Sequence, residues 1–333
     1  MPAQALNLRV LSDETPSGSL ELLTSKSQRY KTARAIIDLV FQLLERSDMR
    51  ECLVATAQHI VIGLRGSKFE SLWPLGRRGE TSIPEMPSFI DFFLHQLRQD
   101  FPEVQLSRNL QGEAAVCLKA WAAEQESPTV YSWKGRDLGH MVLSRDIINC
   151  MVSTKNPTSY RSFMCQMIIS TAHEIAHLLT AALTGGRYRS TPKKLNMGSG
   201  EGEAGFFFEV KAFGGITEFY ASLSQPNDTR QPGIPYIFKG KGLNDLGMKL
   251  DEKTIQSFVE DISGIKLPLV PENISQFPNE QKFPGLEIVT LQNRVKLAEA
   301  YPKLNPSPRN INANLSIDSN LSNDLELGVE FIK

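Results

Sequence analysis

The sequence predicts an α+β fold, a mainly helical domain with a small sheet beside its longest helix. Three observations support this class. Apolar residues recur at helical spacing in several segments. Short β-branched or alternating pieces lie between those segments. Paired glycines at 185–186 and 214–215 follow two of the apolar segments, where glycine commonly ends a helix.

The first half of the chain mixes helical and strand signals. A helix is expected near 33–46, because apolar residues recur there at helical spacing. The β-branched run 59–64 has the character of a short strand, and a second helix is expected around 89–97. The pieces 129–133 and 140–143 fit strands of a small sheet, while 146–150 fits the start of a helix.

The second half carries the clearest helix boundaries. Asn156 followed by Pro157 is a good helix start, and the helix can run to Thr184 before Gly185 and Gly186. A second apolar helix is expected over 203–213. Asp251 can cap a further helix that ends before Gly264, and 286–300 is expected to form the last helix.

Composition and charge indicate one globular domain. Residues 1–25 and 303–333 are polar and without sustained periodicity, so we expect a flexible N-terminal segment, a single domain over 26–302 and a disordered tail. The chain has 36 basic and 37 acidic residues, which predicts no nucleic-acid or membrane partner. No run approaches about 18 apolar residues, and the four cysteines are scattered, so a cytoplasmic protein with structural thiols is expected.

The motif His173-Glu174-Ile175-Ala176-His177 lies inside the helix predicted over 157–184. Spacing of four residues puts both imidazoles on one helix face, one turn apart. Neutral imidazole is a good zinc ligand, and a catalytic zinc keeps one position open for water. Glu174 beside the pair can act as general base toward that water. The alternative of two hydrogen-bonded core histidines would require separate partners for three buried polar groups.

A catalytic zinc needs a third protein ligand. Position 183 is Leu, which excludes the pattern with a third histidine six residues after the second. The next candidates are acids on the following apolar segment. Glu203 is the first choice, because the small residues Ala204 and Gly205 would let that segment approach the metal helix. Glu209 is the alternative ligand, or it orients a ligating histidine. Glu201 and Glu218 are expected to be solvated surface acids.

The constellation resembles the gluzincin metallopeptidases, in which HExxH is joined by a glutamate from a following helix. HEIAHLL looks like their active-site helix, and GEAGFFFEVKAFGG is similar to uncharacterised fungal HExxH proteins. The resemblance covers roughly 156–215. It implies a metalloprotease-like fold with His173, His177 and Glu203 as zinc ligands and Glu174 as the catalytic residue. Oxyanion stabilisers in such enzymes are often Tyr or His, for which Tyr188, Tyr220, Tyr236 and His140 are candidates.

Three functions fit these residues. The first is a zinc-dependent hydrolase that cleaves peptides. The second uses the same ligands on a non-peptide small molecule, for example in fungal metabolism. The third is a non-catalytic, metal-stabilised binding protein, against which Glu174 argues, since a structural zinc has no use for a free carboxylate. A peptidase needs an open cleft with an edge strand, whereas a metabolite enzyme encloses its ligand. The Arg187–Lys194 loop could attract an acidic substrate, but a charged loop is usually only solvated.

Overall fold

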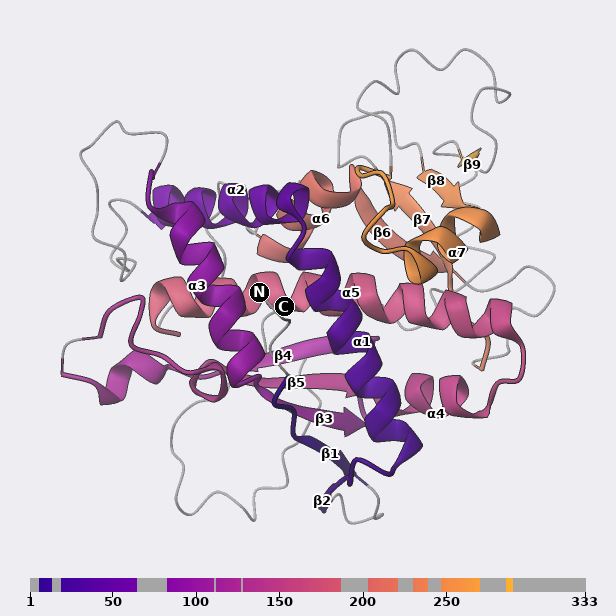
Figure 1. The fold of residues 1–333 in the computed structure, drawn as a ribbon, viewed down its shortest axis with the longest axis horizontal. Helices are drawn as coiled ribbons and strands as arrows, with labels where there is room; N and C mark the ends of the chain where they lie inside the picture. The colour runs from indigo at the N-terminus through magenta and orange to yellow at the C-terminus, as the bar shows by residue number, and fades with distance from the viewer. Residues whose placement is uncertain are drawn as a thin grey trace.

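The protein was analysed as a computed structural model. It describes residues 6–13, 19–64, 83–110, 112–126, 128–186, 203–220, 230–238, 247–269 and 286–289. Within these residues the fold is α+β, as predicted, with two separate sheets and seven α-helices. Figure 1 shows the longest helix, α5, crossing the molecule between the larger sheet and the C-terminal elements.

The N-terminal elements build a mixed five-stranded sheet and its helices. In chain order they are β1 (Val10–Asp13), β2 (Leu20–Leu22), α1 (Gln28–Leu44), α2 (Ser47–Leu64), α3 (Met86–Gln99), β3 (Glu103–Ser107), β4 (Ala114–Leu118), β5 (Gly139–Ser144) and α4 (Arg145–Ser153). Two short 3-10 helices, Trp121–Glu124 and Gly135–Asp137, lie between β4 and β5.

The strand order of this sheet is β2-β1-β3-β5-β4. Strands β1, β3 and β5 run parallel, while β2 and β4 lie antiparallel to their neighbours at the two edges. Val104, Leu106, Val116, Met141 and Leu143 belong to the main hydrophobic core. The sheet therefore presents one face to the helices and leaves β4 as its edge strand beside α5.

Helix α5 (Pro157–Thr184) has the predicted boundaries. The Asn156 side chain accepts hydrogen bonds from the backbone N–H groups of Thr158 and Ser159, which satisfies two donors of the first turn. Gly185 ends the helix with φ at 71°, a left-handed conformation that glycine adopts without a Cβ clash. Almost every residue from position 163 to 184 is buried, so α5 is the central helix of the domain.

The C-terminal elements are α6 (Ala204–Phe213), β6 (Ile216–Tyr220), β7 (Ile234–Phe238), β8 (Gly247–Leu250), α7 (Glu252–Glu260) and β9 (Leu286–Val289). The four strands form an antiparallel sheet in sequence order. Helices α6 and α7 pack against α5, and α6 also packs against α2. Gly214 ends α6 at φ 84°, and Asp251 caps α7, both as expected.

Several local expectations were wrong. The run 59–64 forms the last turns of α2, because its apolar residues continue the helical spacing of Leu53, Thr56 and Ala57. Residues 129–133 form a turn and not a strand. Leu286–Val289 is a strand paired with β8, and the rest of the helix expected over 286–300 lies outside the described residues.

The flexible and folded segments predicted from the sequence agree only in part with the structure. The stretch 1–25, expected to be flexible, contains β1 and β2 of the larger sheet. The tail 303–333 lies outside the described residues, as does the basic loop 187–194. None of the described helices is long and apolar enough to cross a membrane. All four cysteines are free thiols, and burial raises the pKa of Cys165 to about 12.

Candidate metal centre

The two histidines of the motif lie in the middle of α5, on one face. Their ring centroids are 5.3 Å apart, as expected for residues one turn apart. His173 is 8% exposed and His177 is 4% exposed. Both rings are therefore withdrawn from water and need polar partners within the protein.

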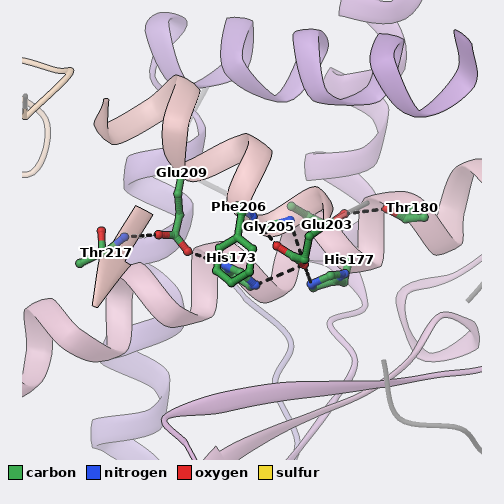
Figure 2. A network of polar contacts seen from close by, with 9 residues as sticks. His173, His177, Thr180, Glu203, Gly205, Phe206, Glu209 and Thr217 are labelled. Atoms are coloured by element: carbon green, nitrogen blue, oxygen red, sulfur yellow. Dashed lines mark hydrogen bonds and ion pairs between the residues drawn. The ribbon is translucent and has the colours of Figure 1, made fainter. Parts of the chain in front are cut away.

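Glu203 brings its carboxylate to both rings. Its Oε1 lies 2.5 Å from Nε2 of His177 and 3.5 Å from Nε2 of His173. Glu203 is also the N-cap of α6, since its carboxylate accepts the backbone N–H groups of Gly205 and Phe206. The start of α6 thus fixes the orientation of this acid toward α5 (Figure 2).

His173, His177 and Glu203 form a group that could hold a metal ion, with one ligand atom from each residue within 4.8 Å of the others. Two ligands of one tetrahedral zinc, each at about 2.0–2.1 Å, are separated by about 3.4 Å. The distances between the ligand atoms of His173, His177 and Glu203 lie below and above that separation, so small side-chain movements would make room for an ion. Two imidazoles and one carboxylate are a donor set typical of catalytic zinc.

Glu209 lies on the other side of His173. Its Oε1 is 2.5 Å from Nδ1 of His173, and its Oε2 accepts the backbone N–H of Thr217 at 2.6 Å. Figure 2 shows this chain of contacts running from β6 through Glu209 to His173. A partner on Nδ1 leaves Nε2 as the nitrogen that faces Glu203. Of the two acidic candidates for the third ligand, Glu203 belongs to the group that could hold a metal ion, and Glu209 contacts Nδ1 of His173.

Nδ1 of His177 is buried, and no residue in the described part of the chain forms a hydrogen bond with it. The His173 ring is held by packing as well as by its polar partners. The edge of the Phe206 ring meets the His173 ring at a centroid distance of 4.8 Å. Gly205 lies against the same ring, and a Cβ at this position would come within 2.3 Å of Nε2. The small residue after Glu203 therefore permits the close approach of α6 to α5.

The electrostatics of the cluster are strongly coupled. Burial alone would lower the pKa of His173, but the charge and hydrogen bonds of Glu203 and Glu209 outweigh it and hold that pKa well above its usual value. Burial would likewise raise the pKa of Glu203, yet His173 and His177 hold it well below its usual value. His173 and Glu203 thus stabilise each other as a buried ion pair.

Glu174 is also buried, at 4% exposure. Burial raises the pKa of its carboxyl group, against the opposing effects of the two histidines and of the backbone N–H of Val116. Glu174 is not part of the metal group. The charges of His173, His177 and Glu203 and the backbone of Val116 all act on its carboxyl group, which therefore lies near the cluster and strand β4.

Strand β4 is an edge strand, so the backbone groups along one of its edges point away from the sheet. Residues of an antiparallel pair alternate between bonding to the partner and pointing away from it. Hydrogen bonds at the two ends of β4 show which residues bond to β5. The backbone N–H of Ser144 donates to the carbonyl of Glu113 at 2.9 Å, and the N–H of Lys119 donates to the carbonyl of Leu138 at 3.0 Å. The backbone groups of Ala114, Val116 and Leu118 consequently point away from β5. No strand in the described part of the chain pairs with that side.

The other residues singled out from the sequence lie elsewhere. Glu218 was expected at the surface, which was wrong, because it is 6% exposed and accepts a hydrogen bond from Tyr220 at 2.6 Å. Tyr220 and Tyr236 pack edge to face in the C-terminal sheet, and His140 lies on β5, where burial and Lys119 lower its pKa to about 4. Glu201 and Tyr188 lie outside the described residues.

Two polar residues near the cluster were missed. Gln166, on α5, is 1% exposed and donates a hydrogen bond to Glu113 at 2.9 Å. Burial raises the pKa of Glu113 to about 7. The sequence could have placed Gln166 on the same helix face as His173, because it precedes His173 by seven residues and a helix returns to the same face after two turns. Nothing local indicates its contact with Glu113.

Comparison of the chain with protein-family models, with curated proteins and with solved structures found no match. The arrangement of side chains is therefore the basis on which a function can be argued.

Proposed function

We propose that this protein is a zinc-dependent hydrolase that cleaves peptide bonds. The observation that carries the proposal is the convergence of one ligand atom each from His173, His177 and Glu203 within 4.8 Å, with the Glu174 carboxyl group beside them. Three protein ligands leave a position open, which is typical of catalytic and not of structural zinc.

The residues of the chain then have separate roles. Zinc bound there would polarise a carbonyl group and lower the pKa of water. Glu174 would take the proton of the attacking water and return it to the leaving amine. Glu209 keeps Nδ1 of His173 engaged, so that Nε2 is the ligating nitrogen.

A peptide substrate is favoured over a small molecule by strand β4. Its outward backbone groups at Ala114 and Leu118 can pair with an extended chain, while the backbone N–H of Val116 faces the Glu174 carboxyl group. An added strand at this edge would bring its own peptide bonds next to the general base. An enzyme for a small metabolite would need no such edge.

The first test is metal content. Purified wild-type protein is expected to hold about one zinc per chain by mass spectrometry after reconstitution, and Glu203→Ala to lose it. Glu209→Ala should bind zinc more weakly but retain it at saturating concentration. A wild-type protein that takes up no zinc would rule out the hydrolase.

The second test separates binding from catalysis. Glu174→Gln should hold zinc as the wild type does, and its cleavage of a mixed peptide library should fall by at least about 10²-fold. Unchanged cleavage would remove the general-base role. A zinc-loaded wild type that cleaves no peptide would instead favour the small-molecule enzyme or the binding protein.

A further inference from the structure

Gln166 is a buried polar residue that the proposed chemistry does not use. It lies on α5 two turns before His173, on the same helix face, and only 1% of it is exposed. A polar side chain in such a place must satisfy both ends of its amide. Its two partners directly precede strands of different sheets.

The amide of Gln166 connects three elements. Its Nε2 donates to Oε1 of Glu113 at 2.9 Å, and its Oε1 accepts the backbone N–H of Gly233 at 3.2 Å. Glu113 directly precedes β4, and Gly233 directly precedes β7. A Cβ on Gly233 would lie 2.6 Å from Cβ of Phe219, so the glycine permits this close approach.

Further contacts attach β4 to α5 along its length. Beyond Glu113, the backbone N–H of Val116 faces the Glu174 carboxyl group and lowers its pKa, and Trp121 Nε1 donates to the carbonyl of Ala181 at 3.0 Å. Positions 166 and 174 are separated by about 12 Å of helix rise, and positions 113 and 116 by about 10 Å of strand. The similar lengths mean that β4 runs alongside α5 in the same direction. Gln166 holds the start of the strand, and Glu174 holds its middle.

We propose that Gln166 is a positioning residue, which fixes the free edge of β4 relative to the metal cluster so that a bound peptide lies in register with Glu174. This inference rests on the proposed function. A fully satisfied buried network holds its members in one arrangement. Because a misplacement of about 1 Å can cost about 10²-fold in rate, an anchor two turns from the metal affects catalysis without touching the substrate.

The test compares two substitutions with a matched control. Gln166→Leu keeps a similar volume and removes both hydrogen bonds. Gln166→Glu keeps an acceptor for Gly233 but replaces the donor to Glu113 with a carboxyl group. The control is Thr184→Val, a buried residue on the same face of α5 whose hydroxyl bonds only to Thr180 within the helix.

Both Gln166 variants should hold zinc as the wild type does, and their KM for a peptide substrate should rise about tenfold with a smaller change in kcat. Thr184→Val should change neither. Amide hydrogen exchange gives a reading that does not require activity. Exchange at Val116 should become faster in both variants, whereas exchange at Gly233 should become faster only in Gln166→Leu.

Unchanged KM and unchanged exchange in either variant would overturn the role of Gln166 and leave the peptidase proposal intact. If Gln166→Leu does not fold, Gln166→Glu decides alone. A zinc-loaded wild type without peptidase activity would refute the proposed function. The inference would fall with it, while the exchange data would still show whether Gln166 holds β4 in place.

Discussion

Gly205 lies so close to His173 that a Cβ at position 205 would come within 2.3 Å of the Nε2 atom of the imidazole. The absence of a side chain lets the first turn of α6 reach the metal helix and brings Glu203 to both histidines. We therefore expect Gly205→Ala to displace the His173 ring and to weaken zinc binding by at least about tenfold. The metal-free variant should also unfold more easily than the wild type, because displacing a packed ring costs about 1–3 kcal/mol, which the preference of a helix for alanine over glycine, about 1 kcal/mol, offsets only in part.

Zinc titration with thermal unfolding of the metal-free proteins measures both effects. Ala204→Gly serves as the control, since it removes a methyl group from the preceding position and adds no atom near His173. Wild-type zinc affinity in Gly205→Ala would show that the ring has room to move.

Glu209 offers a second test of ligand orientation. Glu209→Gln retains an oxygen for the N–H of Thr217 but removes the charge beside Nδ1 of His173. We expect a 10- to 100-fold loss of zinc affinity, roughly the effect of losing an outer partner of a ligating histidine. Competition with a chelator gives the affinity. Glu218→Gln, which changes another buried acid, should leave zinc affinity as it is, and an equal loss in both would indicate a general loosening.

Glu113 makes the stability of the protein depend on pH. Its pKa is raised from 4.5 to about 7, first by burial and then by the charge of Glu209, against the opposing effects of Gln166 and His173. Between about pH 4.5 and 7 the unfolded chain releases a proton that the folded protein keeps. The contribution of this group is therefore full below pH 4.5 and is lost as the pH rises through 7, by about 3 kcal/mol in all.

Urea unfolding of wild type and Glu113→Gln at pH 5 and pH 8 tests this. Glutamine is neutral at both values and can still accept the bond from Gln166. The wild type should therefore lose about 2.5 kcal/mol relative to the variant between the two conditions, because part of the whole effect already falls below pH 5. Parallel pH profiles would show that Glu113 is already ionised in the folded protein at pH 5.

A buried ion pair joins the first strand to α4. Nη1 of Arg145 lies 2.8 Å from Oδ1 of Asp13, and the backbone N–H of Arg108 donates to Oδ2 of the same residue. Arg145→Met would leave Asp13 charged and without its cation, so we expect a loss of about 3–5 kcal/mol in the free energy of unfolding. Arg34→Ala breaks a half-exposed pair with Asp38 and should cost under about 1 kcal/mol. Similar losses would mean that water reaches Asp13.

The sequence predicted well those features that have local causes. Asn156 and Gly185 mark the ends of α5 because a capping side chain and a left-handed glycine act on their own neighbours. The ligand pair follows from the spacing along one helix. Glu203 could be chosen because the small residues after it permit close packing, which Gly205 shows directly.

The errors have non-local causes. Strand β1 pairs with β3, and residues 10 and 104 become neighbours only in the folded sheet. Glu218 could be assigned to the surface only because the hydrogen bond from Tyr220 and the packing of the second sheet are invisible in the sequence. Gln166 stands on the same face as His173, but its role depends on Glu113 and Gly233, which directly precede strands of two different sheets.

Glu203 serves at once as the cap of α6 and as a member of the metal group. The same carboxylate thus couples the local folding of α6 to occupancy of the site. A cation that binds only the folded arrangement would stabilise it by mass action, by about 2.7 kcal/mol at a hundredfold excess over the dissociation constant. The concentration of available metal would then set the resistance of this region to unfolding and proteolysis. When metal is scarce, the protein would be degraded faster.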